Sequence, residues 1–165
     1  MLGGVRSGKS AFAEGLLREC ASVTYVATAE IRDEEMRARV SVHQARRAAA
    51  GAWQTREAPL ELAAALDGLA GAVLVDSLGM WTTNLLLAER DIDAAVDGLL
   101  ESLAAAAGPV VLVSDEVGLG GVEVNRLARR FADCHGILNQ RIAAQADQVF
   151  LVAAGIAMSI KPAGA

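Results

Sequence analysis

A glycine-rich segment near the amino terminus constrains the fold of this chain more than any other feature. Gly3–Ser10 reads GGVRSGKS and fits the pattern G-x-x-x-x-G-K-[ST] in full. Glycines let the backbone turn its N–H groups inward around phosphate oxygens, where a side chain would collide. The helical pattern of residues 11–17 follows directly, so the amides and dipole of a helix amino terminus would add to the site. The pattern predicts a P-loop that binds the β- and γ-phosphates of a nucleoside triphosphate.

Two side chains at the end of the P-loop have specific expected roles. Lys9 should reach the β and γ oxygens, and the Ser10 hydroxyl should ligate Mg²⁺. The alternative is a glycine turn that happens to carry Lys-Ser before a helix, and the length of the match makes it the weaker interpretation. The residues expected to contact nucleotide here are Gly3, Gly4, Val5, Arg6, Ser7, Gly8, Lys9 and Ser10.

A P-loop normally follows a buried strand, and only Met1 and Leu2 precede Gly3. That strand usually lies in the centre of its sheet, where its loss would expose the hydrogen-bonding groups of its neighbours. We therefore expect a first strand that is short or missing, or a natural start upstream of Met1.

Short apolar runs alternate with helical patterns along the rest of the chain. The runs are continuous rather than alternating, as is typical of strands buried on both faces of a parallel sheet. We predict an α/β fold, a single P-loop NTPase-like domain over 1–165 with a mostly parallel sheet and helices on both faces. The expected strands are 23–27, 72–75, 110–113 and 149–152, and the expected helices are 10–20, 33–50, 61–69, 91–106 and 124–146.

Composition argues against several other classes of protein. No apolar run approaches the ~20 residues of a membrane-spanning helix, and the amino terminus lacks the pattern of an export signal. The net charge is −5 without blocks of like charge, so we expect neither nucleic-acid binding nor membrane insertion. Cys20 and Cys134 are far apart, which favours two reduced thiols in a cytoplasmic protein.

Acidic residues follow two of the predicted strands. Ligands of parallel sheets collect beyond the carboxyl ends of the strands. Asp76 therefore becomes a candidate for holding Mg²⁺, and Asp115 and Glu116 compete for the same role. Each of them could instead cap a helix or a turn, and their spacing does not choose among them.

A cluster of arginines surrounds His43 on the second predicted helix. Arg39, Arg46 and Arg47 would share its face. Their guanidinium groups should disfavour protonation of the imidazole, which leaves a neutral nucleophile in a field suited to polyphosphate. A solvated helix with an idle histidine would look much the same, and the residues alone favour that alternative. His135 lacks such neighbours and is expected to be structural.

Several segments together resemble one known family. Besides the P-loop, the segments that carry this resemblance are the predicted histidine helix with HQARR at 43–47, EVGLG at 116–120 and NRLAR at 125–129. With VATA at 26–29, WQTRE at 53–57 and VDSL at 75–78, they extend the match from Gly3 to about Lys161. The chain resembles the bifunctional adenosylcobinamide kinase/adenosylcobinamide-phosphate guanylyltransferases of cobalamin biosynthesis.

The resemblance implies two reactions. A nucleoside triphosphate, ATP or GTP, first phosphorylates adenosylcobinamide. His43 then attacks the α-phosphate of GTP, pyrophosphate leaves, and adenosylcobinamide phosphate displaces the guanylyl-histidine to give adenosylcobinamide-GDP. A neutral imidazole flanked by arginines is chemically suited to that attack.

The resemblance also implies further site residues and partners. Glu57 and Asp76 match acidic positions that touch base, ribose or Mg²⁺, whereas Asp115 departs from an asparagine that is frequent in the family. The implied ligands are GTP, ATP, Mg²⁺ and a corrinoid, and the implied assembly is a homotrimer. The implied nucleotide contacts outside the P-loop are Ala27, Thr28, Ala29, Gln44, Ala45, Arg46, Arg47, Glu57 and Asp76.

Two other functions stay open on the residues alone. A simple P-loop small-molecule kinase would use Lys9 and Ser10 and transfer only the γ-phosphate. A non-catalytic nucleotide-binding module would keep the loop and transfer nothing. Only the bifunctional enzyme would take covalent label from the α-phosphate of GTP.

Overall fold

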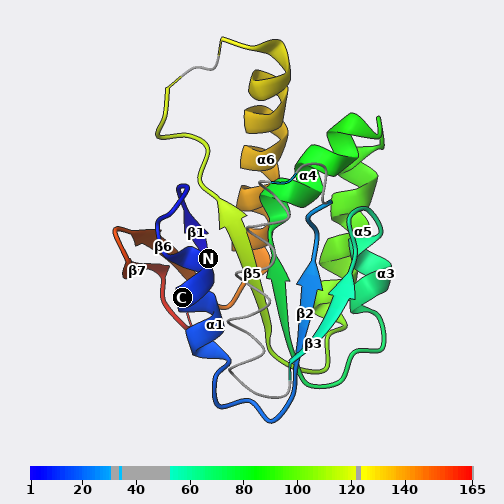
Figure 1. Ribbon diagram of the computed structural model, residues 1–165, viewed down its shortest axis with the longest axis vertical. Helices are drawn as coiled ribbons and strands as arrows, with labels where there is room; N and C mark the ends of the chain where they lie inside the picture. Colours follow the sequence, from blue (N-terminus) through cyan, green and yellow to red (C-terminus); the bar gives the residue numbers. More distant parts are fainter. Residues whose placement is uncertain (31–33, 35–52, 122–123, 165) are drawn as a thin grey trace.

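The computed structural model describes residues 1–30, 34, 53–121 and 124–164. Within them, seven strands form one sheet in the order β3-β2-β4-β5-β1-β6-β7 (Figure 1). Neighbouring strands run parallel except β6 and β7, which are antiparallel. The predicted α/β fold with a mostly parallel sheet is confirmed. The strands are β1 (Leu2–Gly3), β2 (Val23–Ala27), β3 (Trp53–Glu57), β4 (Ala72–Asp76), β5 (Val110–Asp115), β6 (Val149–Ala153) and β7 (Ile156–Lys161).

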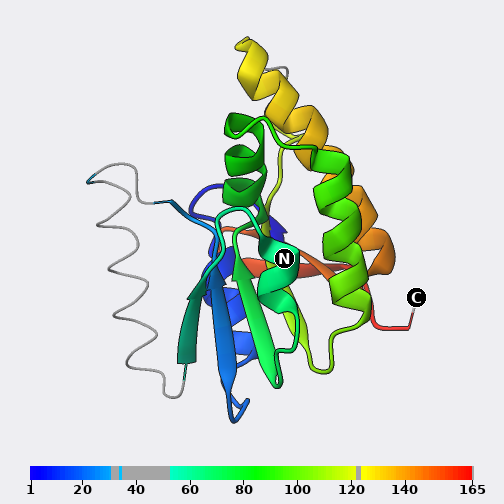
Figure 2. The same cartoon turned by 90° about the vertical axis from the view of Figure 1, so that its right-hand side faces the viewer.

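Helices cover both faces of this sheet, as predicted. Figure 2 shows α1 on one face and the other described helices on the opposite face. Alternate side chains of β4 point to opposite faces of the sheet and pack against both helical layers. Leu74 packs with α1, whereas Val73 and Val75 pack under α3, α4, α5 and α6. The described helices are α1 (Lys9–Leu16), α3 (Leu62–Leu66), α4 (Leu78–Leu87), α5 (Ile92–Ala104) and α6 (Arg126–Gln145).

Three elements were not anticipated from the sequence, namely β3, α4 and β7. β3 and β7 are the outer strands of the sheet, and most of their residues are exposed. β3 is rich in polar residues and lacks the apolar run of a buried strand, whereas β7 is mostly apolar. The turn before β7 places Ala154 and Gly155 at positive φ, 51° and 78°, and alanine gives little sequence signal for such a turn. α4 begins directly after β4, with the Ser77 hydroxyl accepting from Met80 N at 3.3 Å.

Expected and observed helix ends differ by a few residues at several places. The helix expected at 10–20 ends at Leu16, and the one expected at 61–69 is reduced to Leu62–Leu66. Apart from residue 34, the predicted histidine helix at 33–50 lies outside the described residues.

The first strand is short, as predicted, yet it occupies a central position in the sheet. Leu2 pairs with Ser114 of β5 and Leu151 of β6, and Gly3 pairs with Asp115 and Val152. β1 therefore aligns the P-loop with the carboxyl ends of its two neighbours.

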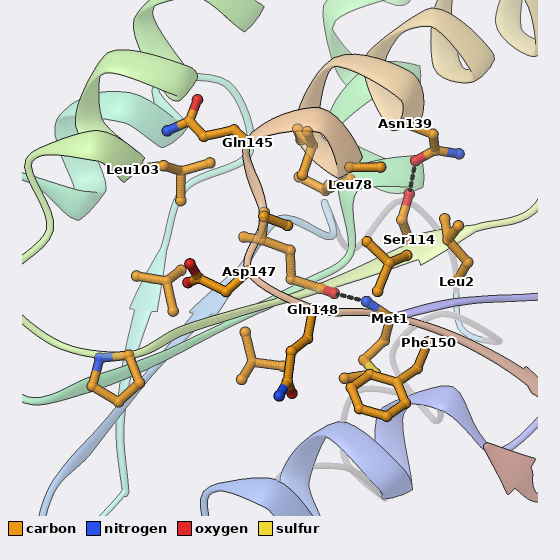
Figure 3. Close-up of a pocket in the computed structure, with 18 of the residues that line it drawn as sticks. Met1, Leu2, Leu78, Leu103, Ser114, Asn139, Gln145, Asp147, Gln148 and Phe150 are labelled. Atoms are coloured by element: carbon orange, nitrogen blue, oxygen red, sulfur yellow. Dashed lines mark hydrogen bonds between the residues drawn. The ribbon is translucent and has the colours of Figure 1, made fainter. Parts of the chain in front are cut away.

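A pocket of about 480 Å³ lies at the amino end of β1, near the amino-terminal parts of β5 and β6 (Figure 3). Its walls include Val110, Leu112, Val149 and Phe150. The amino group of Met1 donates to Leu112 O at 2.7 Å, and burial lowers the pKa of this amino group to about 6. The two residues of β1 thus leave part of the space between β5 and β6 without a strand.

None of the helices in the described part of the chain combines the length and the apolar character needed to cross a bilayer.

Candidate active site

The P-loop turns between β1 and α1 and is held from two sides. Ser7 N donates to Gly4 O at 3.2 Å, and Ser7 O accepts from Gly155 N, in the β6–β7 turn, at 2.8 Å. Gly8 has φ of 95°, a conformation that favours glycine. A β-carbon on Gly8 would also lie 3.1 Å from Gly155 Cα. The conformation of the loop therefore depends on a turn near the end of the chain.

Gly3 is required by space rather than by its backbone angles. A β-carbon there would lie 2.5 Å from Ser7 Oγ and 2.6 Å from Val152 O. Gly4, its neighbour, has nothing within 4 Å of the corresponding point. The two glycines that open the motif thus differ: one is fixed by packing, and the other leaves its space open.

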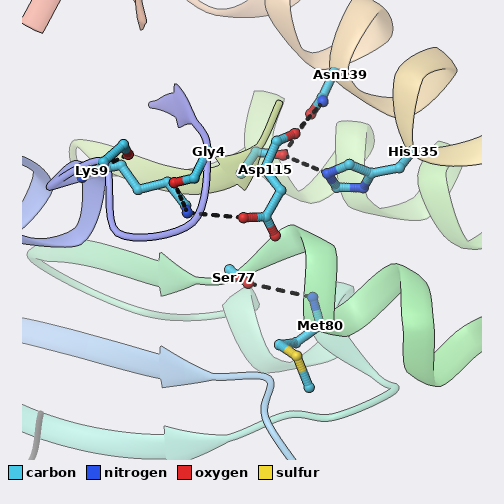
Figure 4. A network of polar contacts seen from close by, with 9 residues as sticks. Gly4, Lys9, Ser77, Met80, Asp115, His135 and Asn139 are labelled. Atoms are coloured by element: carbon cyan, nitrogen blue, oxygen red, sulfur yellow. Dashed lines mark hydrogen bonds and ion pairs between the residues drawn. The ribbon is translucent and has the colours of Figure 1, made fainter. Parts of the chain in front are cut away.

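Lys9 links the loop to the end of β5 (Figure 4). Its Nζ donates to Gly4 O at 3.1 Å and forms an ion pair with Asp115 Oδ1 at 2.9 Å. The Lys9 side chain is 12% exposed and that of Asp115 is 32% exposed. The ammonium group is therefore positioned over the P-loop and shielded from most of the solvent.

Asp115 also lies against the first turn of α4. Gly79 makes room for it, because a β-carbon at that position would overlap the Asp115 Oδ2 atom. The amino end of a helix favours a negative charge. Lys9 and α4 thus both stabilise the Asp115 carboxylate.

A buried polar network supports the backbone of β5 beneath this pair. Asn139 donates its Nδ2 to Asp115 O at 3.0 Å, so its Oδ1 faces Ser114 and accepts from the Ser114 hydroxyl at 2.6 Å. Ser114 Oγ must then accept from His135 Nε2, which lies 3.0 Å away. The Thr82 hydroxyl lies 2.9 Å from His135 Nδ1 and also donates to Leu78 O at 2.9 Å. Both ring nitrogens of His135 thus have a hydrogen-bond partner within the core.

His135 is fully buried, and the ring of Phe131 stacks on it at 5.0 Å between centroids. Burial lowers the pKa of His135, and the nearby Asp115 opposes this shift without reversing it. With both ring nitrogens bonded and no exposed edge, this histidine is a core residue.

Strand register brings several residues of the predicted site to one edge. Ala27 pairs with Glu57 on one side and with Asp76 on the other. Thr28 comes next and is buried: its hydroxyl donates to Ser77 O at 2.7 Å and accepts from Ser77 N at 2.9 Å. Any contact of Thr28 with nucleotide therefore has to leave these bonds in place or break them.

The acids that compete for Mg²⁺ have different surroundings. Glu116 accepts from Gly118 N at 2.6 Å and Leu119 N at 3.2 Å, so its carboxylate caps its own loop. Asp115 is paired with Lys9. Asp76 ends β4 and is half-buried. The surroundings of these acids therefore differ, and they do not by themselves choose the metal ligand.

The oxygen donors near the P-loop, the Ser10 hydroxyl and the Asp76 carboxylate, are of the kind that Mg²⁺ prefers. In the described ranges, no three His, Cys, Asp or Glu residues gather in a way that could hold a metal ion.

Part of the predicted site lies outside the described residues. His43, Gln44, Ala45, Arg46 and Arg47 all belong to this part, and their roles stay predictions. The sequence interpretation in turn missed the partnership of Lys9 with Asp115. The only signal for it was an acid directly after a predicted strand.

The chain matches a family described as cobinamide kinase / cobinamide phosphate guanyltransferase over residues 1–160. It is 45% identical over 167 residues to the bifunctional adenosylcobalamin biosynthesis protein CobP of Pseudomonas aeruginosa, covering 98% of this chain and 95% of that protein. It is 41% identical over 177 residues to CobU of Salmonella typhimurium and 37% identical over 181 residues to CobU of Escherichia coli. Both of these proteins carry the same bifunctional description, and each match covers 96% of this chain and 97% of the relative.

Proposed function

This chain belongs to the cobinamide kinase / cobinamide phosphate guanyltransferase family, and we propose that it performs both reactions with nucleotide bound at the P-loop. It is a bifunctional enzyme of adenosylcobalamin biosynthesis, as are the relatives that match nearly its whole length. The observation that carries the proposal is the position of Lys9, which is held over a P-loop in which the space beside Gly4 is open.

In the kinase reaction, a hydroxyl of the cobinamide attacks the γ-phosphorus of ATP or GTP. The bond to the β–γ bridging oxygen breaks, the nucleoside diphosphate leaves, and the hydroxyl proton is released. Lys9 stabilises the charge on the β and γ oxygens, and the loop amides orient them. Ser10 and Asp76 would hold Mg²⁺, which neutralises phosphate charge when bound.

In the guanylyl transfer, His43 is the proposed nucleophile. A nitrogen of its neutral imidazole attacks the α-phosphorus of GTP, the α–β bridging bond breaks, and pyrophosphate leaves. An oxygen of cobinamide phosphate then attacks the same phosphorus and regenerates the free imidazole. Arg46 and Arg47 are proposed to neutralise charge that develops on the phosphates.

The remaining residues of the proposed nucleotide site lie along the edge of the sheet and on the histidine helix. The register that aligns Ala27 with Glu57 and Asp76 supports a site that extends from the P-loop across the strand ends. The further proposed contacts are Thr28, Ala29, Gln44 and Ala45.

We further propose that the chain is one domain and acts in the cytoplasm as a homotrimer. The single sheet that joins all described strands supports the first point. The corrinoid is its proposed partner, and no nucleic acid is expected to bind.

The test is covalent labelling with GTP that carries the label on the α-phosphate. Wild-type protein should acquire label that is stable in base and labile in acid, as expected of a phosphorus–nitrogen bond, and cobinamide phosphate should remove it. His43→Ala should acquire none, whereas the distant surface variant Asp97→Asn should label like the wild type.

Three results would change the proposal in different ways. Normal labelling of His43→Ala would exclude His43 as the nucleophile. A protein that phosphorylates cobinamide without ever acquiring label would be a simple kinase. Tight binding of GTP without either reaction would indicate a non-catalytic module.

A further inference from the structure

Lys9 is committed to a protein partner at the same place where it should serve the phosphates. Its ammonium lies 2.9 Å from Asp115 Oδ1. A triphosphate in the P-loop would draw that ammonium toward its β and γ oxygens. The positive charge of Lys9 would therefore be shared between the Asp115 carboxylate and the negatively charged phosphates.

Asp115 has little freedom to move away from the arriving phosphates. On one side its residue pairs with Gly3 of β1, and Glu116 N donates to Gly3 O at 3.2 Å. On the other, its carbonyl accepts from Asn139. Its carboxylate lies against Gly79. The negative charge is thus fixed beside the lysine of the P-loop.

The neighbours of Asp115 offer limited compensation for this charge. His135 lies below it and is neutral, because burial lowers its pKa. The other acid at this strand end, Glu116, is turned toward the amides of Gly118 and Leu119. When Lys9 serves the phosphates, the dipole of α4 still favours Asp115 but is a partial charge only.

We propose that Asp115 is a specificity-determining residue of the nucleotide site, whose carboxylate disfavours the bare triphosphate and so selects its complex with a divalent cation. Like charges repel strongly where water is partly excluded, and a divalent cation on the phosphates offsets the repulsion. The inference rests on the proposed function, since it requires that the P-loop binds a nucleoside triphosphate.

Calorimetric titration with GTP, in the presence of Mg²⁺ or of EDTA, tests this selection directly. Asp115→Asn keeps the shape of the side chain and removes its charge. It should tighten binding of metal-free GTP by about ten-fold and binding of the magnesium complex by less than about three-fold. The ratio of the two dissociation constants should therefore fall in this variant.

Asp97→Asn is the matched control, because it removes the same charge from an acid that pairs with Arg141 on the helical layer. The ratio of its dissociation constants for GTP with and without Mg²⁺ should equal that of the wild type. Thermal melting of each variant establishes that it is folded before titration.

A Lys9→Met variant separates repulsion between Asp115 and the phosphates from competition of the two for the Lys9 ammonium group. In Lys9→Met protein, Asp115→Asn should still tighten binding of metal-free GTP, because the carboxylate would still face the phosphates. A gain that disappears in this background would overturn the proposal. So would an unchanged ratio in Asp115→Asn, or equal tightening with and without Mg²⁺.

The same titrations keep this inference distinct from the function on which it rests. A wild-type protein that binds no GTP under either condition would contradict the proposed function. A wild-type protein that labels with GTP while Asp115→Asn leaves the ratio unchanged would contradict the selection by Asp115 alone.

Discussion

The two ends of β1 are packed very differently. At its carboxyl end, Gly3 is packed against Ser7 and Val152, and the P-loop is bonded to Gly155. At its amino end, the chain stops at the amino group of Met1, beside a pocket of about 480 Å³. The two-residue strand β1 is therefore tightly packed at its carboxyl end and loosely packed at its amino end.

The described contacts of the P-loop gather at the carboxyl end of β1. The loop is held by contacts made after β1, namely the β6–β7 turn and the ion pair of Lys9 with Asp115. We expect changes at the carboxyl end to affect chemistry or the packing of the loop, and changes at the amino end to affect stability alone.

The largest effect is expected from Lys9→Ala. Removing a cation that stabilises phosphate charge should lower kcat/KM of the kinase reaction by about 10²–10³-fold. The melting temperature should fall only modestly, because the ion pair with Asp115 is lost but no core packing is removed. Steady-state assays and thermal melting measure the two quantities. Unchanged kinetics would mean that the nucleotide binds elsewhere.

Gly3→Ala should be the next most severe change at the carboxyl end of β1. Its β-carbon would collide with Ser7 Oγ and Val152 O, and we expect a loss of about 2–3 kcal/mol in the free energy of unfolding. Gly4→Ala is the matched control, with open space at the same point. Urea denaturation without nucleotide should separate the two variants. Equal losses would show that packing at Gly3 does not fix the loop.

A pair of leucine variants compares the packed centre with the pocket. Leu74 on β4 is fully buried, and Leu74→Ala should cost about 3 kcal/mol. Leu112 is only partly buried and lines the pocket, so Leu112→Ala should cost about 1 kcal/mol. Chemical denaturation gives both values. A cost for Leu112→Ala as large as that for Leu74→Ala would mean that the pocket is closed in solution.

A pH dependence of stability also distinguishes the two ends of β1. The folded-state pKa of the Met1 amino group is about 6 against an ordinary value of 8.0, so stability should fall as the pH drops from 8 through 6. Because this group keeps some contact with water, we expect a loss on the order of 1–2 kcal/mol.

His135 should add a second decrease at lower pH. Its pKa is also lowered in the fold, from 6.5, so its contribution is complete above pH 6.5 and is lost below it. Acetylation of the amino group should abolish the first decrease and keep the second. Unfolding measured from pH 5 to 9 would show this, and a single unchanged transition after acetylation would contradict the assignment of Met1.

Much of the layout could be predicted from the chain itself. The continuous runs at β2, β4, β5 and β6 reflect strands buried on both faces, and burial on both faces leaves a strong apolar signal. β3 lies at one edge of the sheet and is polar-rich, so it carried no such signal. β7 lies at the other edge and is mostly apolar, but the turn that separates it from β6 is weakly marked in the sequence. A short β1 and its usual place inside the sheet were anticipated, but the strands on either side of it followed only from the observed pairing.

The P-loop, its lysine and the family were determined by sequence, because backbone freedom at glycines and the chemistry of phosphate binding depend on residue type at fixed short spacing. The pairing of Lys9 with Asp115, the space at Gly79 and the neutral state of His135 were decided by tertiary structure. Their partners are far apart along the chain, so only packing sets the distances and the burial on which their charges depend.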